Sequence, residues 1–160
     1  MADPSSQKPL TRKSKPVRSL RARALAALAR REYSRHELAV KLQPFAEDPA
    51  EIPVLLDDFE RRGWLSETRV VEQVLATRRR RFGTQRIAQE LRGKGISDAA
   101  IGAAREQLKE SEIDAARAVW QRKFKVPPVD ARERARHMRF LQGRGFGLDT
   151  IRRLLRNEDE

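Results

Sequence analysis

Apolar residues recur at every third or fourth position along most of the chain, which is the spacing of one helix face rather than of a strand. The stretch 82–108 shows this most clearly, as two short periodic runs around a turn that carries Gly93 and Gly95. Ser97 follows the turn, where its hydroxyl can accept an unpaired backbone N–H at the start of a helix. The stretch therefore predicts two short helices joined by a glycine turn. Their inward-facing residues are Ile87, Ala88, Leu91, Ile101, Ala104 and Leu108.

This two-helix pattern occurs three times in the sequence. Shifted forward by 50 residues, LRGKGI at Leu91 meets LQGRGF at Leu141. Shifted back by 49 residues, Leu91 meets Leu42. A further helix precedes the pattern, because SETRVVEQVL from Ser66 matches SEIDAARAVW 45 residues later. Internal repeats of this length indicate stacked units, each of which is too small to bury its apolar face alone.

We therefore predict an all-α protein made of three tandem three-helix repeats in an elongated, curved array. No stretch alternates apolar and polar residues convincingly enough to indicate a strand. Pro, Ser and basic residues without periodicity predict a disordered basic tail at the N-terminus. The expected boundaries are 1–18 for the tail and 19–65, 66–110 and 111–160 for the three repeats.

Polar residues at the expected helix starts support this division. In a capping box, the side chain of the first residue and a carboxylate three residues later each accept a backbone N–H. Pairs with this spacing are Ser34 with Glu37, Asp48 with Glu51, and Asp130 with Glu133. Pro49 would then occupy the first helical position, where its missing N–H costs no hydrogen bond. Ser66 is a further expected cap, as is Ser111 together with Asp114.

Two expectations concern apolar side chains of the first repeat. Leu25 and Leu28 are predicted to face inward from the first helix. Gly63 can adopt the left-handed conformation that ends a helix. We therefore expect Trp64, which follows it, to fold back onto Phe59 rather than to bind a partner.

The charge balance indicates what kind of partner the protein binds. The 160 residues have a formal net charge of +12 and a pI of about 11.1. The excess is unevenly placed, because 1–18, 66–110 and 111–160 carry +4 each, whereas 19–65 balances eight basic against eight acidic side chains. This distribution indicates an anionic partner, with nucleic acid as the leading candidate, over a merely well-hydrated surface.

Basic residues of the second and third repeats are the candidate residues for binding a partner or DNA. Four consecutive arginines occupy 78–81, and they cannot share one helix face because each step along a helix turns by about 100°. Two interpretations remain open for these arginines. They bind an anion, or they are solvated side chains at the end of a helix, where cations are also favoured. The candidates are Arg78, Arg79, Arg80, Arg81, Arg86, Arg92, Lys94, Arg122, Lys123, Lys125, Arg144, Arg152 and Arg153.

The sequence offers no catalytic constellation. Without cysteine, the chain can form no thiolate nucleophile, disulfide or Cys-ligated zinc site. His36 and His137 are better explained as surface or packing residues than as ligands, and no set of metal ligands is evident. The segment Gly93–Gly95 lacks the upstream strand and the spacing of a phosphate loop. We therefore expect neither an enzyme nor a cofactor, and no membrane span, because no apolar run approaches about 20 residues.

A three-helix unit also suits a stand-alone, non-sequence-specific DNA-binding module of the helix-turn-helix type, which is the alternative function. The helix that would read the bases, 98–108, begins DAAIGAA. Its first turns hold no Arg, Asn or Gln, the side chains that read base edges most often. Sequence-specific readout is therefore disfavoured, whereas contact with phosphates is not.

Four motifs together resemble the RecX family of bacterial regulatory proteins. They are YSRHEL at 33–38, RGWLSE at 62–67, RIAQELRGKGI at 86–96, and RFLQGRGF at 139–146 with TIRRLL after it. The resemblance covers all three repeats, from about 20 to 155. Two local departures are Thr84 and Gln85, where members often carry Pro, and Gly147, where a capping Ser is common.

The resemblance implies tandem three-helix repeats and a regulatory function. Members bind the RecA recombinase and its nucleoprotein filament and inhibit its ATPase and strand-exchange activities, in DNA repair and SOS regulation. The family implies no catalytic residue and no turnover. A curved array lying along the filament groove would bridge neighbouring recombinase subunits, with its basic residues toward DNA or an acidic protein surface. We expect a cytoplasmic monomer.

Overall fold

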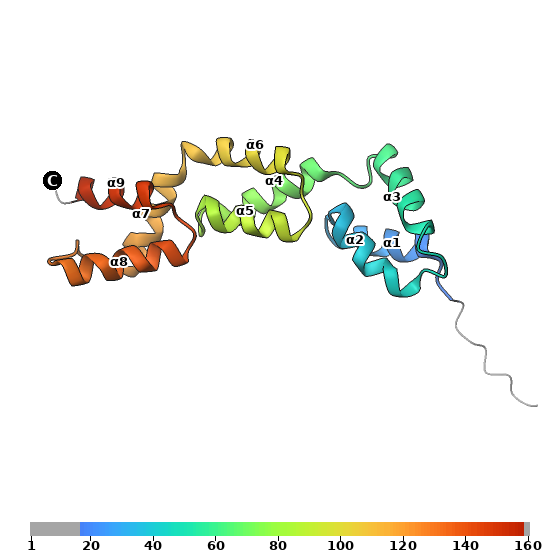
Figure 1. Cartoon of the computed structure of the whole chain (residues 1–160), viewed down its shortest axis with the longest axis horizontal. Helices are drawn as coiled ribbons and strands as arrows, with labels where there is room; N and C mark the ends of the chain where they lie inside the picture. The colour runs from blue at the N-terminus through green and yellow to red at the C-terminus, as the bar shows by residue number, and fades with distance from the viewer. Residues whose placement is uncertain (1–16, 159–160) are drawn as a thin grey trace, which may run out of the picture.

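The computed structural model describes residues 17–158 of the chain, and this part is all-helical. The predicted tail lies outside the described residues except for Val17 and Arg18, which are exposed. Nine α-helices follow one another within the described range, and three consecutive helices make each unit (Figure 1). Their bounds are α1 Leu20–Leu28, α2 Arg35–Leu42, α3 Glu51–Arg61, α4 Glu67–Arg78, α5 Thr84–Gly93, α6 Asp98–Lys109, α7 Glu112–Lys123, α8 Ala131–Gly143 and α9 Leu148–Glu158, with a 3-10 turn η1 at Gln43–Phe45.

The three units lie in a row, and the molecule is elongated (Figure 1). Each unit has its own apolar core, so the described chain has three small cores instead of one large one. Residues at equivalent positions of the three repeats are buried to the same extent, because Leu42, Leu91 and Leu141 are all fully buried. The prediction of three tandem three-helix repeats in an elongated array is therefore confirmed.

The glycine turns adopt the backbone conformation that their sequence predicts. Gly63, Gly95 and Gly145 have φ values of +71°, +74° and +91°, which L side chains rarely adopt. Each lies two residues after the end of a helix, where the left-handed conformation lets the next backbone N–H groups turn back to the last carbonyls. Trp64 then packs edge-on against Phe59, with ring centroids 5.5 Å apart, so the predicted contact forms.

Most predicted helix starts are confirmed. The Oγ of Ser34 accepts from the Glu37 N–H at 3.1 Å, and the Glu37 carboxylate accepts from the Ser34 N–H at 2.9 Å, which completes a capping box. Ser66, Ser97 and Asp130 each accept the backbone N–H three residues later. The predicted box at Asp130 is only half formed, because the Glu133 carboxylate accepts from the Val129 N–H instead of the Asp130 N–H. These contacts satisfy donors that have no partner within the first turn of a helix.

Three predictions about the ends and faces of helices are wrong. Ser111 makes no capping bond, because its Oγ donates to the Leu108 carbonyl oxygen instead. Asp48 accepts from Ala50 N–H at 2.9 Å in the loop, so Pro49 lies before α3 and no box with Glu51 forms. Leu25 faces outward and is 38% exposed, since the core side of α1 is formed by Ala24 and Ala27.

Candidate partner-binding surfaces

The second and third units are joined by backbone hydrogen bonds, and this joint brings basic residues of both units together. The Gly83 N–H donates to the Arg144 carbonyl at 2.8 Å, and the Gln85 N–H donates to the Gly145 carbonyl at 3.1 Å. The two segments can approach this closely only because glycines meet, since a Cβ on Gly83 would lie 2.3 Å from the Gly145 carbonyl oxygen. The start of α5 is therefore fixed against the turn between α8 and α9.

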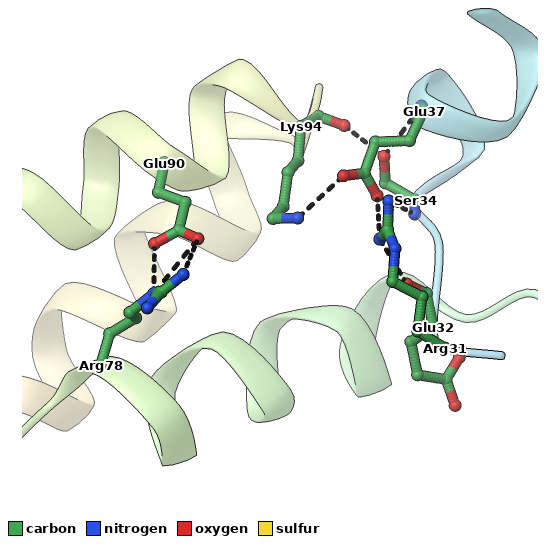
Figure 2. Close-up of polar contacts among 7 residues, drawn as sticks. All are labelled: Arg31, Glu32, Ser34, Glu37, Arg78, Glu90 and Lys94. Atoms are coloured by element: carbon green, nitrogen blue, oxygen red, sulfur yellow. Dashed lines mark hydrogen bonds and ion pairs between the residues drawn. The ribbon is translucent and has the colours of Figure 1, made fainter. Parts of the chain in front are cut away.

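The first and second units are joined at the equivalent place, but mainly by side chains. The start of α2 lies against the turn between α5 and α6, and the Ser34 hydroxyl donates to the Lys94 carbonyl (Figure 2). Lys94 Nζ lies 2.8 Å from Glu37 Oε1, and Arg31 approaches the same carboxylate at 3.4 Å. Burial alone would raise the pKa of Glu37, but hydrogen bonds from Lys94 and the Ser34 N–H hold it below its ordinary value.

Four of the thirteen candidate basic residues make side-chain contacts away from the hollows described below. Arg78 pairs with Glu90 across α4 and α5, at 3.1 Å (Figure 2). Arg79 donates to Ser111 Oγ at 3.0 Å, and Lys94 pairs with Glu37 as described. The guanidinium of Arg86 lies over the Phe82 ring, 4.1 Å from its centroid. These side chains hold helices and units together, which leaves them less able to bind an external anion.

Four other candidates meet around one hollow at the boundary of the second and third units. This central basic hollow, of about 440 Å³, is lined by Arg81, Val119, Arg122, Lys123, Phe140 and Arg144. No acidic residue lines it, and none of its four basic side chains forms an ion pair within the described part of the chain. The guanidinium of Arg144 lies 5.5 Å from the Phe140 centroid and 5.8 Å from that of Phe82. An anion in this hollow would relieve repulsion between like charges.

Arg152 and Arg153 belong to a second basic surface, between α8 and α9. This terminal basic hollow, of about 580 Å³, is lined by Arg134, Met138, Asp149, Arg152, Arg153 and Arg156. Its single acidic lining residue leaves an excess of positive charge. The last three candidates, Arg80, Arg92 and Lys125, are exposed and line neither hollow.

Sequence reasoning missed the uncharged lining of the central basic hollow. Phe140 and Val119 lie there, and Phe140 also packs edge-on against the core residue Phe124, with ring centroids 5.5 Å apart. Helical periodicity cannot separate such a residue from the core, because it belongs to the edge of the apolar face. Only the joint between units shows that its ring borders a basic hollow.

Neither hollow is lined by a histidine, serine, threonine or tyrosine from the described part of the chain. Among the described residues, no set of three or more His, Cys, Asp or Glu residues could hold a metal ion. His137 is buried and accepts a hydrogen bond from Trp120 Nε1 at 3.1 Å, so it serves in packing. No helix in the described range is long and apolar enough to cross a bilayer.

Comparison with known proteins identifies the family. Residues 66–104 match a model described as "RecX, second three-helix domain", and residues 110–155 match "RecX, third three-helix domain". The chain is 50% identical over 146 residues to "Regulatory protein RecX" of Leptothrix cholodnii, covering 91% of this chain and 93% of the relative. The chain belongs to the RecX family. A relative of the same name from Ralstonia nicotianae is 46% identical over 141 residues, covering 88% and 89% of the two chains.

Solved structures agree with this assignment at the level of the fold. The crystal structure of RecX from Lactobacillus salivarius superimposes with a TM-score of 0.77 at 18% identity, covering 88% of this chain and 94% of that one. A second crystal structure, of a regulatory protein RecX, gives a TM-score of 0.75 at the same identity. RecX proteins are regulators, and none of these matches indicates an enzyme family.

Proposed function

We propose that this chain binds the RecA recombinase and its nucleoprotein filament and inhibits its ATPase, strand-exchange and recombination activities. Through this inhibition it takes part in DNA repair and SOS regulation. Membership of the RecX family supports a regulatory role, and the resemblance of the sequence motifs names the partner. We further propose that it acts as a monomer in the cytoplasm.

The observation that carries this proposal is the combination of an elongated array with two basic hollows. A filament repeats the same subunit along its axis, so an elongated molecule can contact several subunits at once. Nucleic acid within the filament supplies phosphates, which bind clustered Arg and Lys side chains independently of base sequence. By occupying the groove of the recombinase filament, the protein hinders the subunit movements that ATP turnover and strand exchange require.

The central basic hollow is the proposed point of contact with phosphates. Its four cations come from two units, and the joint between those units is fixed by backbone hydrogen bonds. Arg side chains suit phosphate because their planar donors can bind two oxygens at once. The terminal basic hollow extends this positive surface toward the end of the array.

The alternative is a DNA-binding module whose contact with the recombinase is secondary. It is favoured by the same basic hollows and by the three-helix form of each unit. Base readout by α6 remains disfavoured, because Ala99, Ala100 and Gly102 occupy its first turns. Both functions therefore predict salt-sensitive binding with little sequence preference.

Binding measured at matched salt separates the two functions. The full chain is titrated against a recombinase filament on single-stranded DNA and against the same DNA without the recombinase. The proposed function predicts clearly tighter binding to the filament. Equal affinity for both would support the DNA-binding module and contradict the proposal.

A further inference from the structure

The first unit carries an apolar groove that the basic hollows do not explain. This first-unit groove lies between α1 and α3 and has a volume of about 710 Å³, larger than either basic hollow. Its apolar lining is Leu20, Ala50, Val54 and Leu55. Val54 is 69% exposed, whereas the core side of the same helix buries Ile52, Leu56 and Phe59. Single exposed valines are ordinary on protein surfaces, but this one lies among other apolar side chains in a hollow.

The spacing along α3 produces this second face. Glu51, Val54, Leu55, Asp58 and Arg61 all line the groove, and they follow one another at the three- and four-residue steps that place side chains along one side of a helix. The helix is therefore apolar on its core side and presents a mixed stripe, with an apolar centre, on its groove side. The first-unit groove is thus a continuous feature of α3 and not a gap in the packing.

The charges around the groove differ from those of the rest of the molecule. Its lining holds three acidic residues, Asp48, Glu51 and Asp58, and two arginines, Arg21 and Arg61. Asp58 is paired with Arg21 and Arg62, each at 3.0 Å, and with Arg61 at 3.5 Å. The carboxylate of Glu51 forms no ion pair within the described residues.

The end of the rim at Glu51 disfavours phosphates and favours a cation. An uncompensated carboxylate beside an apolar surface favours a lysine or arginine on a partner, because like charges brought together oppose binding. Charge complementarity thus favours a protein over nucleic acid as the occupant. The neutral balance of 19–65, against +4 in each of the other two repeats, points the same way.

We propose that the first-unit groove binds the partner protein, through a segment that carries a large apolar side chain next to a lysine or arginine. Contacts with nucleic acid then fall on the second and third units. This inference rests on the proposed function, in which the partner protein is the recombinase. It divides the binding of the filament between a protein-binding unit and a phosphate-binding pair of units.

The first test replaces the exposed valine without changing the net charge. Val54→Gln keeps a good helix former at an exposed helical position, so the fold is retained. Val126→Gln is the matched control, because Val126 is 64% exposed and lies between α7 and α8, away from the groove. We expect Val54→Gln to weaken filament binding by about tenfold, the effect of losing a valine-sized apolar contact. Its affinity for a labelled oligonucleotide should equal that of the parent, as should both affinities of Val126→Gln.

The second test reverses the charge on the rim. Glu51→Lys should weaken filament binding without weakening oligonucleotide binding, whereas Glu72→Lys, an exposed change on α4, should spare the filament. Thermal melts of all four variants show whether the fold is retained. Parental filament affinity in both Val54→Gln and Glu51→Lys would overturn the groove assignment and leave the proposed function standing. A parent chain that does not bind the filament at all would instead contradict the proposed function.

Discussion

At the scale of single residues, His137 shows how the surroundings decide a role that its sequence position leaves open. The ring stacks on Phe124 with centroids 3.6 Å apart, and its Nδ1 accepts from Trp120 Nε1 at 3.1 Å. Burial and the nearby charge of Arg136 lower the pKa of His137, against the opposing effect of Glu133. The neutral ring is therefore the form that the folded protein holds.

Stability should fall as the pH drops below about 6.5, the pKa of an unfolded histidine. In that range the unfolded chain takes up a proton more readily than the folded one, so protonation favours unfolding. His137→Phe keeps an aromatic ring but removes the titrating group and the acceptor for Trp120. We expect it to cost about 1–3 kcal/mol at neutral pH and to lose less stability than the parent between neutral pH and pH about 5.5. Melts of both chains across this range measure the difference, and parallel pH profiles would contradict the assignment.

Gly145 provides a second prediction at this scale. Its φ is +91°, and an added Cβ would lie 2.3 Å from the Cβ of Arg86 across the joint. Gly145→Ala should therefore destabilise the third unit by more than about 1 kcal/mol. Gly143→Ala is the matched control, because no atom lies within 4 Å of a Cβ there. Equal melting temperatures for the two variants would show that the close approach is not required.

At the scale of helices, periodicity and capping residues predicted most of the structure because both are local. The Ser34–Glu37 box and the caps at Ser66 and Ser97 form as expected. Ser111 fails as a cap because α6 and α7 are separated by so short a turn that its hydroxyl donates to the Leu108 carbonyl. The prediction for Leu25 is wrong because alanines form the core side of α1. A rule that places large apolar residues in the core cannot indicate this.

The repeat alignment predicts equal consequences at equivalent core positions. Leu91 and Leu141 are both fully buried, in the cores of the second and third units respectively. Each substitution to Ala should cost about 2–5 kcal/mol, from lost burial and the cavity left behind. Chemical denaturation monitored by circular dichroism measures both. A change within experimental error at either position would contradict the alignment.

At the scale of the whole molecule, the sequence predicted a row of units but not how neighbouring units meet. Apolar periodicity defines each core separately, and the joints are made by backbone groups and ion pairs that leave no periodic signal. The contact between Gly83 and Arg144 and the pairing of Lys94 with Glu37 therefore appear only in three dimensions. This is also why the thirteen basic candidates could not be divided in advance into internal contacts and open hollows.

The central basic hollow should control the salt dependence of DNA binding. Each phosphate neutralised adds about 0.7–0.9 to the magnitude of the slope of log affinity against log salt concentration. Replacing Arg81 and Arg122 by Gln should reduce both the affinity for DNA and this slope. Replacing Arg105 and Arg132 by Gln removes the same charge outside both hollows and should have a smaller effect. Equal effects of the two double variants would show that net charge, and not the hollow, determines binding.

The proposed regulatory role is tested most directly by ATP hydrolysis on an assembled recombinase filament. The full chain is added in increasing amounts, and its occupancy of the filament is followed in parallel by fluorescence anisotropy. If the protein inhibits by occupying the groove of the filament, the rate of ATP hydrolysis should fall as its occupancy of the filament rises. The rate should approach its minimum when the filament is saturated. A saturated filament that hydrolyses ATP at its original rate would contradict the proposed inhibition.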